Sequence, residues 1–327
     1  ISFFIAPAIY ILRKSKKEIV VFIIFLLFPI LLLIYSTSYK NFFLSNELKE
    51  NPFTIRVISS NISLDRFYKN IDTENVINEL INLSSPNPEK KIFFLWPEGI
   101  IPNSYQDEMY LYKDIFLENF EKNHIIGLGV TNQEVKADEY KVYNSFSVFD
   151  NELNLIEIYN KNNLVPFGEF LPFEKILGKM GLKSLTNNYQ SFSSGEKREI
   201  ILISKNEFNI KILPLICYEI IYSGNIFSDS EFDLIINISE DGWFGNSIGP
   251  HQHFTHSIFR AIESGKYLIR SANNGISAII NPTGFVEKKI SFGDSGYIDF
   301  SEKRVSESTL FSQFGNKMFL IIILLYI

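Results

Sequence analysis

The stretch Ile212–Tyr222, with the sequence ILPLICYEIIY, decides the fold expected for the centre of the chain. Its first half is an apolar run, which predicts a short buried strand. Polar residues then recur with helical spacing, which predicts a helix that ends at Ser223 and Gly224. The only cysteine, Cys217, is thus expected where a strand passes into a helix. Backbone N–H groups at a helix start lower the pKa of a thiol and can hold an oxyanion, so Cys217 is a candidate nucleophile. The alternative is a small buried apolar residue.

The overall composition excludes several classes of function. A chain of 327 residues is long enough for one large α/β domain. The net charge is −6 and no basic patch dominates the sequence, which argues against a nucleic-acid partner. A single cysteine excludes an internal disulfide and a cysteine-based zinc site.

Apolar residues concentrate at the two ends of the chain. Residues 1–12 are nearly all apolar and precede a basic cluster, Arg13–Lys17. The uncharged run Ile19–Tyr35 approaches the ~20 residues that span a bilayer, so we expect a transmembrane helix. A signal peptide and a buried core helix are the alternatives. The run Met318–Ile327 is expected to begin another membrane helix, with a C-terminal strand as the alternative.

These runs predict three regions. Residues 1–45 are expected to hold membrane segments: the end of one helix, a basic cytoplasmic loop and one transmembrane helix. Residues 46–315 are expected to form a globular domain on the outer face of the membrane, and residues 316–327 to start a C-terminal transmembrane helix. Since the first residue is Ile, we expect the chain to be part of a longer membrane protein.

The globular region alternates short apolar runs with helical patterns. Several of the expected strands follow each other as hairpins, so a purely parallel sheet is not expected. A charged loop is expected over Gln133–Lys141. Strands are expected at residues 53–61, 92–96, 124–131, 143–149, 156–160, 200–204, 209–216, 233–238, 266–271 and 275–280, and helices at 72–83, 106–122 and 249–263.

Three ionisable residues stand at the ends of apolar strands: Glu98, Lys161 and Cys217. Residues in such positions gather at one edge of an α/β sheet, where binding sites form. A thiol nucleophile needs a base, and a carboxylate in apolar surroundings such as Trp96 and Ile100 can serve. A lysine ammonium favours the thiolate and can hold the oxyanion of a tetrahedral intermediate. Each residue alone could be solvated or structural, whereas together they predict an acyl-transfer site.

Three histidines near residue 250 raise the possibility of a metal site. Their positions, His251, His253 and His256, do not fall on one face of a helix, and no carboxylate cluster completes a ligand set. We therefore expect no metal. A serine hydrolase is not expected either, because a Gly-x-Ser-x-Gly motif is missing from the sequence.

The order Glu, Lys, Cys at three strand ends resembles the nitrilase superfamily, whose fold is an α-β-β-α sandwich. Three segments resemble the apolipoprotein N-acyltransferase family of that superfamily more specifically. They are YNKNNLVPFGEFLP at residues 159–172, ICYE at 216–219 and NISEDGWFGNSIGPHQH at 237–253. The likeness covers residues 15–327 and departs from the family pattern at Glu240, where Asn is expected before Asp241.

The resemblance implies a membrane-bound N-acyltransferase that works in two steps. Cys217 would take a fatty acyl chain from a phospholipid donor as a thioester. The amine of a diacylglyceryl-cysteine on an apolipoprotein acceptor would then receive it, giving ping-pong kinetics. Glu98 would be the general base and acid, and Lys161 with the N–H of Tyr218 would hold the oxyanion.

Further residues receive roles from the same resemblance. Glu169 would orient Lys161, with a turn-capping glutamate as the alternative, and Glu219 would support the pocket unless it is an exposed helical residue. A substrate-facing or lipid-facing role is expected for Trp96, Phe167, Trp243 and Phe244. No cofactor is implied. The expected location is the bacterial inner membrane, with several membrane passes and the catalytic domain on the periplasmic side.

Two rival functions use the same residues. The first is a soluble amidase or nitrile hydrolase of the nitrilase superfamily, in which water attacks the thioester. The second is a non-catalytic lipid-binding module in which Cys217 only packs.

Overall fold

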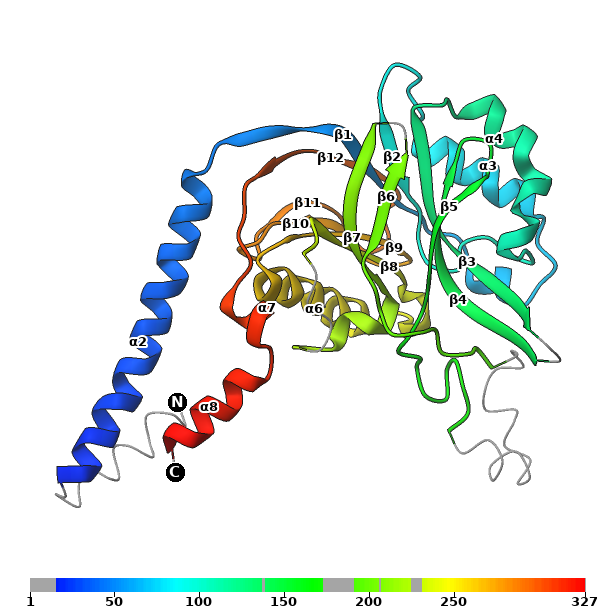
Figure 1. Ribbon diagram of the computed structural model, residues 1–327. Helices are drawn as coiled ribbons and strands as arrows, with labels where there is room; N and C mark the ends of the chain where they lie inside the picture. Colours follow the sequence, from blue (N-terminus) through cyan, green and yellow to red (C-terminus); the bar gives the residue numbers. More distant parts are fainter. Residues whose placement is uncertain (1–15, 137–138, 173–190, 206, 225–230, 327) are drawn as a thin grey trace. The chain divides into compact units, whose positions relative to one another are not determined.

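A computed structural model describes residues 16–136, 139–172, 191–205, 207–224 and 231–326 (Figure 1). The chain divides into two compact units, Ile1–Leu48 and Lys49–Ile327. The apolar run expected over residues 1–12 and the basic cluster that follows it lie outside the described residues.

The first unit contains the helix α2, Lys16–Ser45, with Pro29 inside it. By length and composition, the segment Leu27–Ser45 is the one part of the described chain that could cross a membrane as a helix. Its 19 residues would extend over roughly 28 Å, close to the hydrocarbon thickness of a bilayer. Apolar side chains along it are exposed, including Leu31 at 61% and Leu33 at 68%.

The second unit contains two six-stranded sheets (Figure 1). The first sheet has the order β12-β1-β2-β3-β4-β5 and the second β11-β10-β9-β8-β7-β6. The strands of the first sheet are β1 (Leu48–Ser59), β2 (Ile92–Leu95), β3 (His124–Lys136), β4 (Glu139–Asp150), β5 (Leu155–Asn160) and β12 (Gly296–Arg304). Those of the second are β6 (Ile201–Lys205), β7 (Phe208–Ile216), β8 (Leu234–Glu240), β9 (Tyr267–Asn273), β10 (Ser277–Ile280) and β11 (Val286–Ile290).

Both sheets mix parallel and antiparallel pairs, as the sequence predicts. In the first sheet β1, β2 and β3 are parallel neighbours, and β3, β4 and β5 pair antiparallel. In the second, β7, β8 and β9 are parallel, and antiparallel strands flank them. The parallel strands in the middle point their carboxyl ends to the same edge of each sheet, which is where ligand sites form in α/β folds.

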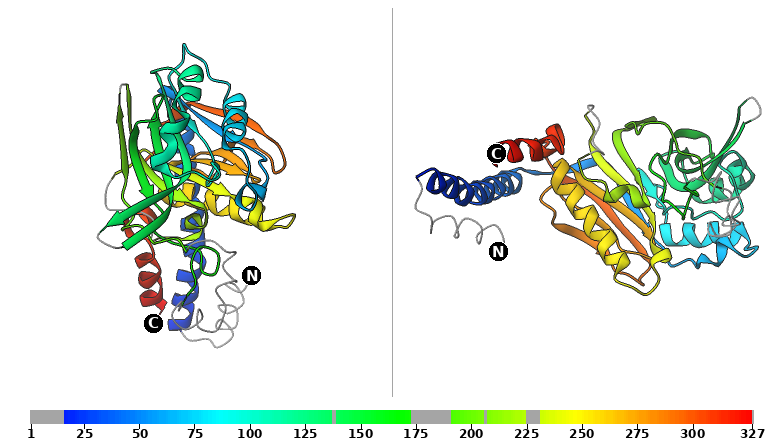
Figure 2. Two further views of the ribbon diagram at one scale, coloured as in Figure 1. Left: turned by 90° about the vertical axis from the view of Figure 1, so that its right-hand side faces the viewer. Right: turned by 90° about the horizontal axis from the view of Figure 1, so that it is seen from below.

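Helices cover the outer face of each sheet (Figures 1 and 2). On the first sheet, α3 (Thr73–Ser84) and α4 (Lys113–Asn119) enclose a core of aliphatic and aromatic side chains. On the second, α6 (Gly249–Ser264) encloses another core with β7 to β10. The side chain of Asp72 caps α3, and Pro250 lies in the first turn of α6. The layers are therefore helix, sheet, sheet, helix (Figure 1), and the expected α-β-β-α sandwich is confirmed.

Short helices complete the unit. Among the described residues, four are 3-10 helices: η1 (Leu64–Phe67), η2 (Gln106–Tyr112), η4 (Cys217–Ile221) and η5 (Asp241–Phe244). Two α-helices, α7 (Leu310–Phe314) and α8 (Lys317–Tyr326), lie near the C-terminus. The apolar run there is helical, so the alternative of a C-terminal strand is wrong.

Several expectations about local structure are corrected. The helix expected over residues 106–122 is instead η2 followed by the short α4. The loop expected over Gln133–Lys141 is largely paired strand, because the β3–β4 ladder continues out to Lys136 and Glu139. Polar side chains are tolerated there because the ladder satisfies the backbone while side chains such as Gln133 keep contact with water. Strands β11 and β12 were not expected.

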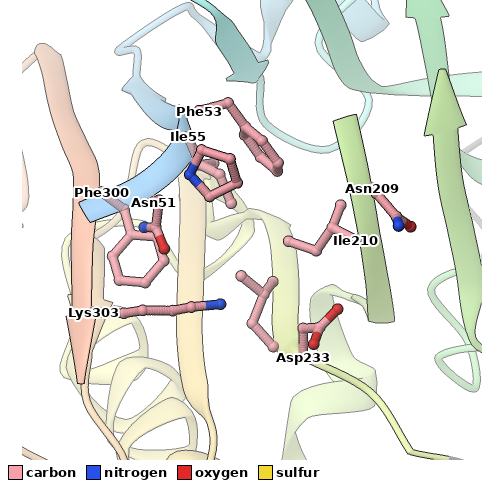
Figure 3. A pocket seen from close by; sticks show the side chains of 10 residues that line it. Asn51, Phe53, Ile55, Asn209, Ile210, Asp233, Phe300 and Lys303 are labelled. Carbon is pink, nitrogen blue, oxygen red and sulfur yellow. The ribbon is translucent and has the colours of Figure 1, made fainter. Parts of the chain in front are cut away.

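A cavity lies at the opposite ends of the parallel strands, away from the carboxyl-end edge. Figure 3 shows it between the first residues of β1, β7 and β8 and the strand β12. Phe53, Ile210, Asp233 and Lys303 are among its lining residues.

Candidate active site

Three strands deliver the three candidate catalytic residues to the carboxyl-end edge. Glu98 follows β2, Lys161 follows β5 and Cys217 follows β7. Lys161 Nζ lies 3.4 Å from Glu98 Oε1, and both side chains are buried. The charges of Glu98 and Lys161 both act on the Cys217 thiol. Glu98 and Lys161, both from the first sheet, are thus in contact, and the Cys217 thiol from the second sheet lies within reach of their charges.

The backbone of Cys217 is in a strained conformation. Its φ is +48°, in the left-handed region that non-glycine residues rarely adopt. Such strain costs about 1–3 kcal/mol and persists only where surrounding contacts impose it. Glu219 Oε2 accepts a hydrogen bond from the N–H of Ile216 at 2.9 Å, and His253 Nε2 lies 3.2 Å from the Cys217 carbonyl oxygen. These contacts hold the turn on both sides of the thiol.

The helix expected after Cys217 is only the five-residue 3-10 helix η4. Its dipole is small because few peptide units are aligned, so it lowers the thiol pKa little. The pKa of Cys217 is in fact raised well above its ordinary value, first by burial and then by the negative charge of Glu98. Lys161 opposes this rise but does not reverse it. At neutral pH the side chain is therefore a thiol, which needs a base to become a nucleophile.

Lys161 is a buried cation held between carboxylates. Burial alone lowers its pKa, but the charges of Glu169 and Glu98 outweigh burial and raise the pKa above its ordinary value. The ammonium is therefore retained at neutral pH. It provides a fixed positive charge in a site largely closed to water, where its effect on a developing oxyanion is greatest.

Asn144 connects the two carboxylates. Its side-chain amide donates to Glu98 Oε1 at 2.7 Å and to Glu169 Oε1 at 2.8 Å. Glu169 Oε1 lies 2.9 Å from Lys161 Nζ, and Glu169 Oε2 accepts from the N–H of Val165 at 2.8 Å. Glu169 therefore contacts Lys161 and also caps the turn at Val165, so both of its expected roles have a matching contact. Sequence reasoning missed Asn144, whose only signal is a polar residue within the apolar pattern of β4.

Glu219 lies in a second buried cluster. Its side chain is inaccessible to solvent, so the alternative of an exposed helical residue is wrong. Glu219 Oε1 accepts from Arg198 at 2.8 Å, from the Tyr159 hydroxyl at 2.8 Å and from the N–H groups of Asn162 and Asn163. The cluster ties the segment after Lys161 to the turn at Cys217. Arg198 was also missed, because nothing in its sequence neighbourhood separates it from other surface cations.

The predicted aromatic residues divide into two groups. Trp96 is completely buried in the core with α3 and α4, and its indole N–H donates to Ser84 Oγ at 2.8 Å. It therefore offers no surface to a lipid. Tyr218 is half-buried, with its ring 5.9 Å from that of Tyr222.

The other aromatic residues are exposed. Phe167 is 53% exposed, Trp243 47% and Phe244 38%. Trp243 stacks on Phe67 of η1 with ring centres 5.1 Å apart, and Tyr68 lies edge-on to it. Phe167, Trp243 and Phe244 are thus the predicted substrate-facing residues that remain accessible.

The histidines have separate surroundings. His253 is buried, with Nδ1 2.9 Å from Asp241 Oδ1. His251 is exposed and lies near Phe292. Asp241 forms an ion pair with Arg270 at 2.8 Å, and Arg270 with His253 lowers the pKa of Asp241 to about 2 against its burial. Across the described ranges, no three His, Cys, Asp or Glu side chains are grouped to hold a metal.

The fold and the site define the class of protein. The sequence profile of the carbon-nitrogen hydrolase family matches residues 95–299, a range that includes Glu98, Lys161 and Cys217. The chain belongs to the carbon-nitrogen hydrolase family.

Curated relatives of the chain include proteins named apolipoprotein N-acyltransferase. The protein from Rickettsia prowazekii is 35% identical over 72% of this chain and 47% of its own length. The protein from Caulobacter vibrioides is 30% identical over 84% of this chain and 53% of its own. The chain therefore spans about half the length of the relatives it matches.

Solved structures agree on the fold. An amidase from Nesterenkonia sp. aligns with a TM-score of 0.53 at 12% identity, over 81% of this chain and 94% of the amidase. In a mutant of the Nesterenkonia sp. AN1 amidase, with a TM-score of 0.52 at 12% identity over 77% of this chain and 93% of that one, the acetamide moiety of fluoroacetamide is covalently added at the active-site cysteine.

Proposed function

We propose that the chain is the acyl-transferring part of an apolipoprotein N-acyltransferase. It moves a fatty acyl chain from a phospholipid, through a thioester on Cys217, to the amine of a diacylglyceryl-cysteine on an apolipoprotein. The observation that carries the proposal is the buried Glu98–Lys161 pair whose charges act on the thiol of a strained cysteine. The names of relatives that are 30% identical or more over most of this chain support the choice of substrates.

In the first half-reaction Glu98 takes the proton from the Cys217 thiol. The sulfur attacks the sn-1 ester carbonyl of the phospholipid, and the carbonyl oxygen becomes an oxyanion beside the Lys161 ammonium and the N–H of Tyr218. The intermediate collapses with cleavage of the ester C–O bond. Glu98 returns its proton to the departing oxygen, which leaves as a lysophospholipid.

In the second half-reaction the free amine of the acceptor attacks the thioester. Glu98 takes a proton from the amine, and Lys161 again faces the oxyanion. The C–S bond breaks, and the proton held by Glu98 passes to the sulfur, so an amide and the free Cys217 thiol result. The raised pKa of Cys217 favours this return to the thiol.

The lipid substrates imply a membrane location. We propose that α2 anchors the chain in the bacterial inner membrane, among several membrane passes, with residues 46–315 as a periplasmic domain and residues 316–327 entering the bilayer. The exposed apolar side chains of α2 support this placement. Phe167, Trp243 and Phe244 would then contact the acyl chains.

The thioester provides the test. The whole chain is incubated in phospholipid vesicles without acceptor, and the intact mass is measured alongside that of Cys217→Ser. We expect one acyl adduct per chain, an equal amount of lysophospholipid, and loss of the adduct when a diacylglyceryl lipopeptide is added. Release of free fatty acid without an acceptor would favour a hydrolase, and the lack of any adduct would contradict the proposal.

A further inference from the structure

A second buried ion pair lies beside Glu98 and has no part in the steps above. Arg66, at the end of η1, is 1% exposed and Glu240, at the end of β8, is 1% exposed. They form a direct ion pair between Arg66 Nη2 and Glu240 Oε2. Two charges withdrawn from water are retained only when paired and hydrogen-bonded, so this pair calls for a structural reason.

Arg66 holds the chain just after Glu98. Its Nε donates to the carbonyl oxygen of Gly99 at 3.1 Å, and its Nη1 donates to the carbonyls of Ile62 and Ser63 at 3.2 and 3.1 Å. The guanidinium therefore fixes the backbone on one side of the Glu98 carboxylate. Gly99 itself has a φ of +52°, which glycine adopts without strain.

Glu240 holds the other side. Its backbone N–H donates to Glu98 Oε2 at 2.8 Å. Its side chain is fixed by Asn273 at 2.6 Å, by Asn274 at 3.2 Å and by the N–H of Gly242 at 2.8 Å. With Asn144 on Oε1, both oxygens of Glu98 have fixed donors.

We propose that the Arg66–Glu240 pair is a positioning element for Glu98, which aims the carboxylate at Cys217 by holding the Gly99 carbonyl and the Glu240 N–H on its two sides. The proposal rests on the proposed function, in which Glu98 is the base.

Because the two members of the pair carry opposite charges, removing one or the other should shift the pH dependence of thioester formation in opposite directions. The ionisable groups that surround Glu98 come from several elements: Lys161 after β5, Glu169 beyond it, Cys217 in η4, Arg66 in η1 and Glu240 in β8. Burial raises the pKa of the Glu240 carboxyl. Where that carboxyl is ionised, Arg66→Met leaves an unpaired negative charge near Glu98, which is expected to move the acid limb of the pH–rate profile of thioester formation to higher pH. Glu240→Gln leaves an extra positive charge and is expected to move the limb to lower pH, each by roughly half a unit or more.

The experiment measures single-turnover thioester formation on the whole chain across pH, together with the thermal midpoint. Arg66→Met is expected to slow the plateau rate by about tenfold or more, since a small displacement of a base is costly. The double variant Arg66→Met/Glu240→Gln restores charge balance and is expected to return the limb close to its wild-type position. Arg56→Met is the matched control, because Arg56 is also buried and pairs with Asp299 and the carbonyls of Ser84 and Ser85. It should lower the thermal midpoint and leave the limb in place.

The inference would be overturned if both single variants lower the thermal midpoint but keep the acid limb of the pH–rate profile at its wild-type position. The pair would then have only a structural role. A wild-type chain that forms no thioester would contradict the proposed function instead. The pair is then tested by the pH dependence of Cys217 alkylation, which responds to the Glu98 charge. Opposite shifts in the two single variants, and none in Arg56→Met, would still support positioning, and equal profiles in all would reject it.

Discussion

The side chain of His253 contacts the backbone of Cys217, the candidate nucleophile. His253 Nε2 lies 3.2 Å from the carbonyl oxygen of Cys217, and the opposite ring nitrogen faces Asp241, itself paired with Arg270. The strained turn at Cys217 is thereby attached to a buried network in the second sheet.

His253→Ala should therefore reduce thioester formation. The Cys217 carbonyl loses its partner, the turn relaxes, and a displaced sulfur is expected to cost about 10- to 100-fold in rate. His251→Ala, on the same helix but exposed, is the control and should keep the wild-type rate. Equal rates in both variants, measured by the appearance of the acyl adduct, would contradict this role for His253.

Glu98→Gln should abolish the thioester while the protein stays folded. The glutamine amide cannot take the thiol proton. Its NH2 group would also face a hydrogen-bond donor, since Asn144 and Lys161 donate to one oxygen of Glu98 and the Glu240 N–H donates to the other. We expect no adduct by intact mass above the Cys217→Ser background. An adduct formed at more than about 1% of the wild-type rate would show that another group acts as the base.

The reactivity of Cys217 with iodoacetamide should change in opposite directions in two variants. Burial and then the Glu98 charge raise the thiol pKa, and Lys161 lowers it. Removing the carboxylate in Glu98→Gln should lower the pKa and speed alkylation near pH 8, although turnover is lost. Removing the ammonium in Lys161→Met should raise the pKa and slow alkylation. A shift in the same direction in both variants would contradict the electrostatic coupling.

Glu219→Gln should destabilise the fold. It removes the charge opposite Arg198 in a cluster closed to solvent, and breaking a buried pair costs about 3 kcal/mol or more. Asp65→Asn breaks the exposed Lys69–Asp65 pair and should change the unfolding free energy by less than about 0.5 kcal/mol. Urea unfolding of the two variants measures the difference, and similar losses in both would reject the prediction.

Sequence patterns could predict the frame of the site because its residues follow strongly apolar strands. The runs before Glu98, Lys161 and Cys217 predict buried strands, and the carboxyl ends of such strands meet at one edge. The Pro250 turn and the amphipathic pattern after it likewise predict α6.

Contacts between segments distant in sequence could not be predicted in this way. Asn144 joins residues 98 and 169 at one edge of the first sheet, and Arg198 joins residue 219 beside the second. Arg66 joins residue 240 across the two sheets, so its partner depends on how the sheets face each other. The burial of Trp96 also depends on tertiary packing. Its position at the end of a strand predicts burial, but the core that encloses it forms only when α3 and α4 pack on the sheet.

The base and the cation come from one sheet, whereas the sulfur comes from the other. Their alignment therefore depends on the seam between two layers, and a slip there would separate the proton acceptor from the thiol while every strand stays paired. Mild denaturant should consequently abolish thioester formation at a concentration that leaves the circular dichroism spectrum unchanged. The rate would then measure the contact between the two layers rather than the secondary structure of either one.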